Sequence, residues 1–198
     1  MEDSYKTISQ PSEAIFKDKS SKFIAYAFPV FTEDEIKEIL LKLKKEHHSA
    51  RHHCYAYQLG ANKELFRAND DGEPSNSAGK PILAQIQSRD LTNVLVVVVR
   101  YFGGILLGVG GLINAYRSAT QMALENAEIV SKTVEQILKI DFEYTAMNSV
   151  MKIVKDFQVD VLESKFDNNC SIKISFPFSK SEIIIAKLNE IETVKVKS

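Results

Sequence analysis

Apolar and polar positions follow two patterns along this 198-residue chain. Short alternating or continuous apolar runs indicate strands, and apolar positions three or four residues apart indicate amphipathic helices. Within the first 130 residues, these patterns predict strands at 13–17, 22–30, 54–59, 65–68 and 93–100, and helices after Thr32, at 81–87 and after Gly111. Thr32 and Glu35 fit the capping box that opens a helix. The run at 93–100 is apolar on both faces, so we expect a central strand covered on both sides.

The expected order of elements changes after about residue 133. The pattern predicts a strand at 134–142, a helix at 145–157, strands at 159–165 and 170–176, a helix at 181–189 and a strand at 193–197. This β-α-β-β-α-β order is that of the ferredoxin-like motif. Because such a motif closes a core of its own, we expect an α+β protein with two domains, residues 1–130 and residues 131–198.

Composition and charge narrow the classes of function. The chain is 44% hydrophobic and 26% charged, with a net charge of −1, which excludes a uniformly basic protein that coats nucleic acid. Its longest apolar run, 94–99, is far shorter than a membrane span, and the first residues lack the plan of a signal peptide. We therefore expect a cytoplasmic protein with no membrane partner, in which Cys54 and Cys170 are separate reduced thiols.

A glycine-rich turn between the apolar run and a helix is the first candidate site. Five of the eight glycines fall within nine residues: Gly103, Gly104, Gly108, Gly110 and Gly111. The turn lacks the lysine and hydroxyl of a nucleotide P-loop, and Ile113 stands where a dinucleotide fingerprint has its last glycine. Two interpretations stay open: the free N–H groups of the helix start attract an anion, or the glycines only permit turns and close packing.

A polar loop and a histidine cluster are the other candidates. The loop contains Asp70, Asp71, Gly72, Glu73 and Pro74, whose acids either form the turn and cap a helix or bind a hard cation. Three acids are too few to predict a metal. All four histidines lie within 47–53, but their spacing does not fit a zinc site, and no nucleophile and base pair is recognisable. We expect no metal, no cofactor and no catalytic residue.

Three segments carry a resemblance to a known family: HHCYAY at 52–57, DDGEPSNSAGKPIL at 70–83 and RYFGGILLGVGGL at 100–112. In order and spacing they resemble the signature of the IMPACT/YigZ-type family, and Leu106 stands where that family often has a lysine. The resemblance covers the whole chain. It implies an N-terminal domain similar to domain IV of elongation factor G and to the GHMP kinases. It also implies a ferredoxin-like C-terminal domain similar to domain V of elongation factor G.

The resemblance also implies a role in translation, because eukaryotic members regulate translation through protein partners. We therefore expect a non-catalytic regulator that binds RNA or a ribosome-associated partner. The expected cationic contacts near the glycines are Lys80, Arg100 and Arg117. Two alternatives are a pure protein-interaction module and an enzyme acting on a phosphorylated small molecule, which a pocket shared by the two loops would favour.

The two candidate loops are expected to lie side by side. An acidic loop beside an anion-attracting turn would repel phosphate unless cations neutralised its acids. We therefore expect Arg100 to pair with one of the carboxylates between Asp70 and Glu73 and to be partly structural. Lys80 and Arg117 would then remain for contact with phosphate.

Overall fold

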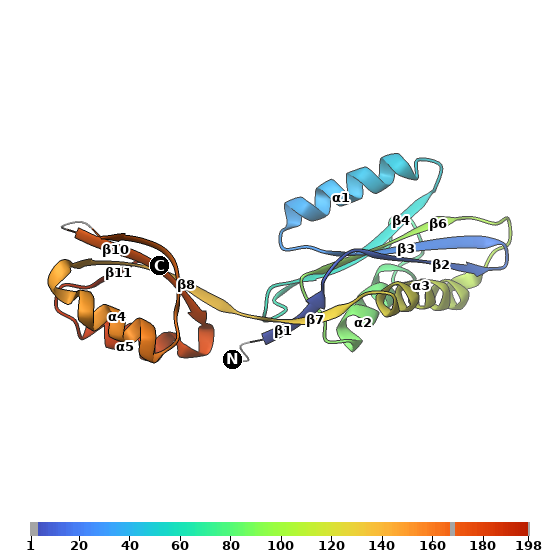
Figure 1. The fold of residues 1–198 in the computed structure, drawn as a ribbon. Helices are drawn as coiled ribbons and strands as arrows, with labels where there is room; N and C mark the ends of the chain where they lie inside the picture. The colour runs from blue at the N-terminus through green and yellow to red at the C-terminus, as the bar shows by residue number, and fades with distance from the viewer. Residues whose placement is uncertain (1–3, 167–168, 198) are drawn as a thin grey trace. The chain divides into compact units, whose positions relative to one another are not determined.

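The computed structural model describes residues 4–166 and 169–197, which form two compact units. One unit spans Tyr5–Lys132 and the other is built on the residues from Thr133 onward. Both units combine helices with strands (Figure 1), so the predicted α+β class is confirmed. The division lies within two residues of the expected boundary, inside strand β7 (Ile129–Thr133). Independent folding of the two units stays a prediction.

The N-terminal unit is organised by a five-stranded sheet in the order β2-β3-β6-β4-β5. Each strand pairs antiparallel with its neighbours. The strands are β2 (Ser12–Asp18), β3 (Ser21–Pro29), β6 (Val94–Tyr101), β4 (His52–Leu59) and β5 (Leu65–Asn69). The predicted central strand is confirmed, because β6 lies in the middle and its side chains from 94 to 99 are all fully buried.

Helices cover both faces of this sheet (Figure 1). On one face, α1 (Glu33–Glu46) packs over the core that contains Leu95, Val97 and Val99. On the other face, α2 (Gly79–Ser88) and α3 (Gly108–Glu125) pack over the core that contains the alternate valines of β6. The Thr32 capping box is present at the start of α1, as the sequence predicts.

One small sheet in this unit is not predicted from the sequence. Strand β1 (Ser4–Ile8) lies beside β7, although about 120 residues separate them. Each strand has five residues, and β7 has no fully buried side chain. A pairing between two such short strands depends on a distant partner, so the local pattern carries little signal for it.

The C-terminal unit has the predicted β-α-β-β-α-β order. Its antiparallel sheet has the order β11-β8-β10-β9, and its helices lie on one face of that sheet (Figure 1). The elements are β8 (Glu135–Glu143), a 3-10 turn (Tyr144–Ala146), α4 (Met147–Asp156), β9 (Asp160–Phe166), β10 (Asn169–Pro177), a second 3-10 turn (Phe178–Lys180), α5 (Ser181–Asn189) and β11 (Lys195–Lys197). The core lies between the helices and alternate residues of β8 and β10. Among the described residues of this unit, no helix lies on the other face of the sheet.

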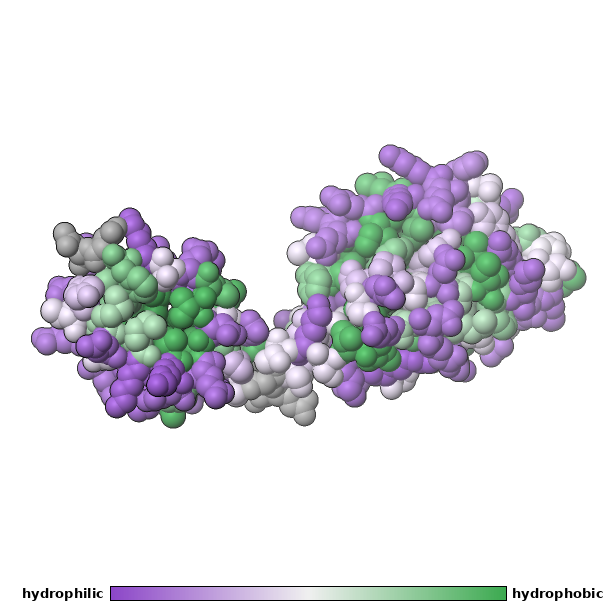
Figure 2. All heavy atoms as spheres, viewed as in Figure 1, coloured by the Kyte–Doolittle hydropathy of each residue, from purple (hydrophilic) through white to green (hydrophobic). Residues whose placement is uncertain are grey.

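Hydropathy divides the surface from the interior. Hydrophilic side chains cover most of the visible face of both units, with apolar patches between them (Figure 2). Cys54 and Cys170 are buried, one in each unit. Among the described helices, none is both long and apolar enough to cross a membrane.

Candidate functional site

The two candidate loops border one cavity of about 390 Å³ in the N-terminal unit. We call residues 70–78 the motif loop and residues 102–107 the glycine loop. The lining comes from the motif loop (Glu73, Pro74), from the glycine loop and the start of α3 (Phe102, Leu106, Leu107, Gly108, Val109, Leu112), and from strand ends (Arg51, His52, Arg100). The prediction that the two loops lie together is confirmed.

A buried ion pair joins the motif loop to the central strand. The Nη1 atom of Arg100 lies 2.6 Å from Oε1 of Glu73, and the two side chains are 7% and 4% exposed. The guanidinium also lies 5.5 Å from the ring centres of Phe23 and Phe102. The predicted pairing of Arg100 with a motif-loop carboxylate is confirmed. The charge of Arg100 is therefore neutralised within the protein.

A hydrogen-bond chain continues from this ion pair into the core. The Tyr116 hydroxyl on α3 donates to Oε1 of Glu73 at 2.8 Å. The Cys54 thiol on β4 lies 3.2 Å from the Tyr116 oxygen and 3.0 Å from the carbonyl oxygen of Asp70, and it donates to one of them at a time. Burial raises the pKa of both the thiol and the phenol. Both groups therefore stay protonated near neutral pH and supply no nucleophilic anion.

Sequence reasoning did not identify Tyr116 and Cys54 as part of the site. Tyr116 occurs in the apolar stripe of its helix, and its phenolic oxygen is the one available signal. A tyrosine on a buried face needs a polar partner for its hydroxyl. Which partner it has depends on the packing of α3 against the motif loop, and the spacing of residues does not contain that information.

The two aspartates of the motif loop accept hydrogen bonds from backbone N–H groups. Oδ1 of Asp70 accepts hydrogen bonds from the N–H groups of Ala78 (3.0 Å) and Gly79 (2.8 Å), and Oδ2 accepts from that of Asn76 (2.9 Å). Asp70 thus satisfies free donors at the start of α2. Oδ2 of Asp71 accepts from the N–H of His53 at 2.7 Å. These contacts favour the turn and capping interpretation over cation binding.

The histidines make separate contacts with the protein. The two ring nitrogens of His47 lie 2.9 Å and 2.8 Å from the hydroxyls of Tyr26 and Tyr101. His52 Nδ1 donates to the carbonyl oxygen of Asp71 at 2.9 Å. His53 is buried, and its removal from water lowers its pKa. Within the described residues, no group of three histidine, cysteine or acidic side chains could hold a metal ion.

The glycine loop combines backbone constraints with an apolar surface. A Cβ atom on Gly103 would lie 2.1 Å from the carbonyl carbon of Ser20, so this position requires glycine. Gly108 adopts a φ of +71° where α3 begins, whereas a Cβ on Gly110 would meet open space. The side chains most exposed around the loop are apolar: Phe102, Ile105, Leu106 and Val109.

The remaining predicted site residues lie outside the cavity. Gly103, Gly104, Gly110 and Gly111 do not line it, and neither do Asp70, Asp71 and Gly72. Lys80 on α2 and Arg117 on α3 are exposed but also do not contribute to the lining. The structure thus brings together Glu73, Pro74, Arg100 and Gly108, in surroundings that are more apolar than the sequence predicts.

Fold and site together define a class of two-unit α+β protein in which a DDGEP loop and a glycine loop border one cavity. A family model, the Impact N-terminal domain, matches residues 19–124. The IMPACT family member YvyE of Bacillus subtilis is 37% identical over 166 residues, covering 84% of this chain and 76% of that protein. This chain belongs to the IMPACT family, which confirms the resemblance carried by the three motifs.

Two further relatives show how far the similarity extends. Protein IMPACT of Rattus norvegicus is 37% identical over 94 residues, which cover 46% of this chain and 30% of that protein. A crystal structure described as that of a hypothetical protein is 28% identical, with a TM-score of 0.74, and the match covers 100% of this chain and 98% of the other. The overall fold is therefore shared with a solved protein.

Proposed function

We propose that this protein is a non-catalytic regulator of translation and that its N-terminal cavity binds a ribosome-associated protein partner. The observation that carries the proposal is the character of the glycine loop. Leu106 is 83% exposed, and Phe102 and Val109, which line the same cavity, are each about half exposed, as is Ile105 in the glycine loop. Apolar and aromatic side chains around a preformed cavity are typical of the central part of a protein interface.

The charges of the site favour a protein partner over RNA. Of the two arginines that line the cavity, Arg100 is neutralised by Glu73, which leaves Arg51 as the exposed cation of the lining. Lys80 and Arg117 lie outside the cavity, and Leu106 replaces the lysine that the family often has. RNA is the alternative ligand of this face, with Lys80 and Arg117 as its phosphate contacts. If it binds there, replacing both by Ala would weaken binding and flatten its dependence on salt.

The link to translation comes from the family. The resemblance implies that eukaryotic members regulate translation through protein partners, and Protein IMPACT of the rat matches 46% of this chain. The implied similarity of the two units to domains IV and V of elongation factor G belongs to the same proposal. A protein built like two domains of a ribosome-binding factor is suited to contact the translation apparatus.

An enzyme acting on a phosphorylated small molecule is the second candidate, and the shared cavity favours it. A volume of about 390 Å³ is enough for a small ligand. Arg51 and His52 line it and are the polar groups left for such a ligand, because Glu73 is paired and Asp70 and Asp71 hold the backbone. Buried Cys54 and Tyr116 stay protonated, which removes two potential nucleophiles.

The test is a binding experiment with the full chain carrying an affinity tag. The tagged protein is incubated with ribonuclease-treated, salt-extracted ribosome-associated proteins from its own source, using wild type, Leu106→Asp and Leu41→Asp. Leu41 is 61% exposed on α1 and serves as the matched control. We expect wild type and Leu41→Asp to retain the same partner and Leu106→Asp to lose it. Equal retention by all three would contradict the proposal, and turnover of a phosphorylated compound would favour the enzyme.

A further inference from the structure

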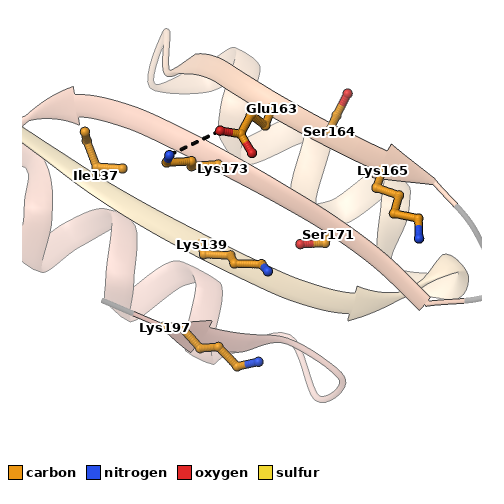
Figure 3. Close-up of a pocket in the computed structure, with 8 residues that line it drawn as sticks. All are labelled: Ile137, Lys139, Glu163, Ser164, Lys165, Ser171, Lys173 and Lys197. Carbon is orange, nitrogen blue, oxygen red and sulfur yellow. Dashed lines mark hydrogen bonds and ion pairs between the residues drawn. The ribbon is translucent and has the colours of Figure 1, made fainter.

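The open face of the C-terminal sheet carries a group of lysines, which we call the lysine face: Lys139, Lys165, Lys173 and Lys197. They come from β8, β9, β10 and β11, so every strand of the sheet contributes one. Their side chains border a shallow hollow of about 540 Å³ over the strands (Figure 3). The helices of this unit lie on the opposite face, so none of the described helices of the unit covers the hollow (Figure 1).

The strand register places three of these lysines directly beside one another. Lys197 pairs with Lys139 across β11 and β8, and Lys139 pairs with Lys173 across β8 and β10. Adjacent strands are about 4.8 Å apart, and like charges placed opposite each other in a sheet repel. The row therefore destabilises the sheet slightly unless a counter-charge lies over it.

The protein supplies only part of that counter-charge. Glu163 lies 3.2 Å from Lys173, and Asp141 lies 2.6 Å from Lys197. Lys139 stands between these two pairs and makes no hydrogen bond or ion pair with the described residues. Lys139 therefore lies in the middle of the row over the open face of the sheet (Figure 3). Asp141 is bonded to Lys197 and attracts the Lys139 charge without a hydrogen bond, which leaves the Lys139 ammonium group for an external anion.

We propose that the lysine face binds the phosphate backbone of single-stranded RNA. Four lysines on four strands extend about 14 Å across the sheet, a distance that suits a chain of phosphates better than one compact anion. None of the eight residues that line the hollow is aromatic. Binding therefore uses phosphate contacts without base stacking and has little dependence on sequence.

Oxygen acceptors between the lysines favour RNA over DNA. In the next row of the sheet, Asp141 and Ser171 pair across β8 and β10, and Ser171 pairs with Lys165 on β9. Ser164 also borders the hollow, but its hydroxyl points away from the lysines (Figure 3). Carboxylate and hydroxyl oxygens accept hydrogen bonds from the ribose 2′-hydroxyl, which DNA lacks. These acceptors form the row of the sheet next to Lys197, Lys139 and Lys173, so a strand whose phosphates follow the lysines brings its riboses beside them.

The experiment measures fluorescence anisotropy of labelled rU20 with the full chain at several KCl concentrations. The Lys139→Gln/Lys173→Gln variant is compared with Lys152→Gln/Lys187→Gln, which removes the same charge from exposed positions on the helices. We expect the first variant to bind at least tenfold more weakly. Its slope of log K against log salt should flatten by about 1.4, since each phosphate contact contributes about 0.7 for single strands. Circular dichroism melts show whether each variant is folded.

Each other outcome overturns a named part of the proposal. Equal affinity and slope in the two double variants would remove the lysine face as the site. Equal affinity for dT20 would overturn the assignment to RNA, and a strong preference for rA20 over rU20 would overturn backbone-only binding. The proposal does not rest on the protein partner of the N-terminal cavity. Leu106→Asp should therefore leave rU20 binding unchanged, so that the two proposals fail or survive separately.

Discussion

The N-terminal cavity and the lysine face of the C-terminal sheet use charge in opposite ways. At the cavity, Arg100 and Glu73 form a buried pair, and the surface that remains is apolar. On the lysine face, the charges lie on an open sheet and are only partly paired. A charge that is buried and paired holds elements together, whereas an exposed cation can contact a ligand. The position of a charged residue in the fold therefore says more about its role than its place in a motif.

The largest expected effect on stability distinguishes the buried ion pair of Arg100 and Glu73 from the exposed pair of Lys173 and Glu163. Glu73→Gln leaves the Arg100 charge buried without a partner, so we expect a loss of about 3–5 kcal/mol in the free energy of unfolding. Glu163→Gln removes an exposed partner of Lys173 and should change that free energy by less than about 1 kcal/mol. Urea denaturation measures both. Similar losses in the two variants would contradict the distinction between a structural and an exposed charge.

Two variants test which glycines between 103 and 111 are constrained by packing. A methyl group at Gly103 would overlap the backbone of Ser20, so Gly103→Ala should destabilise the N-terminal unit by about 1–3 kcal/mol. Gly110 faces open space inside α3, so Gly110→Ala should be neutral or stabilising by up to about 1 kcal/mol. Thermal and urea denaturation of the two variants give the comparison. A stable Gly103→Ala would show that the loop is not constrained by this contact.

Gly103 and Gly108 show how much of the structure the sequence predicts. Apolar periodicity finds the central strand, the helices and the β-α-β-β-α-β order, because local patterns determine which faces are buried. Of the glycine cluster at 103–111, Gly108 alone lines the cavity, and a functional role for the cluster stays a prediction. However, packing against Ser20 and the φ of Gly108 arise from tertiary contacts, which the motif alone does not reveal.

Two features of the sites could not be predicted from the sequence, and the reason is the same for both. The apolar character of the cavity follows from the pairing of Arg100 with Glu73, which leaves Leu106 and its neighbours as the exposed groups. The lysine face follows from strand register, which brings Lys139 and Lys173 together although 34 positions separate them. Neither residue stands out along the chain, because a lysine on an exposed strand face is common.

A smaller effect concerns pH and His53, a buried histidine of the N-terminal unit. Burial lowers the pKa of His53, so the unfolded chain binds a proton more readily than the folded protein. The contribution of His53 to the free energy of unfolding is fully present above the unfolded pKa of about 6.5, and it is lost as the pH drops below that value. Urea denaturation from pH 7.5 to 5 should show this loss, and His53→Gln should reduce it. His48→Asn changes an exposed neighbour and should leave the profile of the wild type.

The central claim is that the two units bind different partners through different chemistry. The most direct measurement captures bound material from lysate with the tagged full chain and quantifies protein and RNA separately for Leu106→Asp and Lys139→Gln/Lys173→Gln. We predict that Leu106→Asp loses the protein partner and keeps RNA, and that the lysine variant keeps the partner after ribonuclease treatment and loses RNA. Loss of the same material in both variants would contradict the claim.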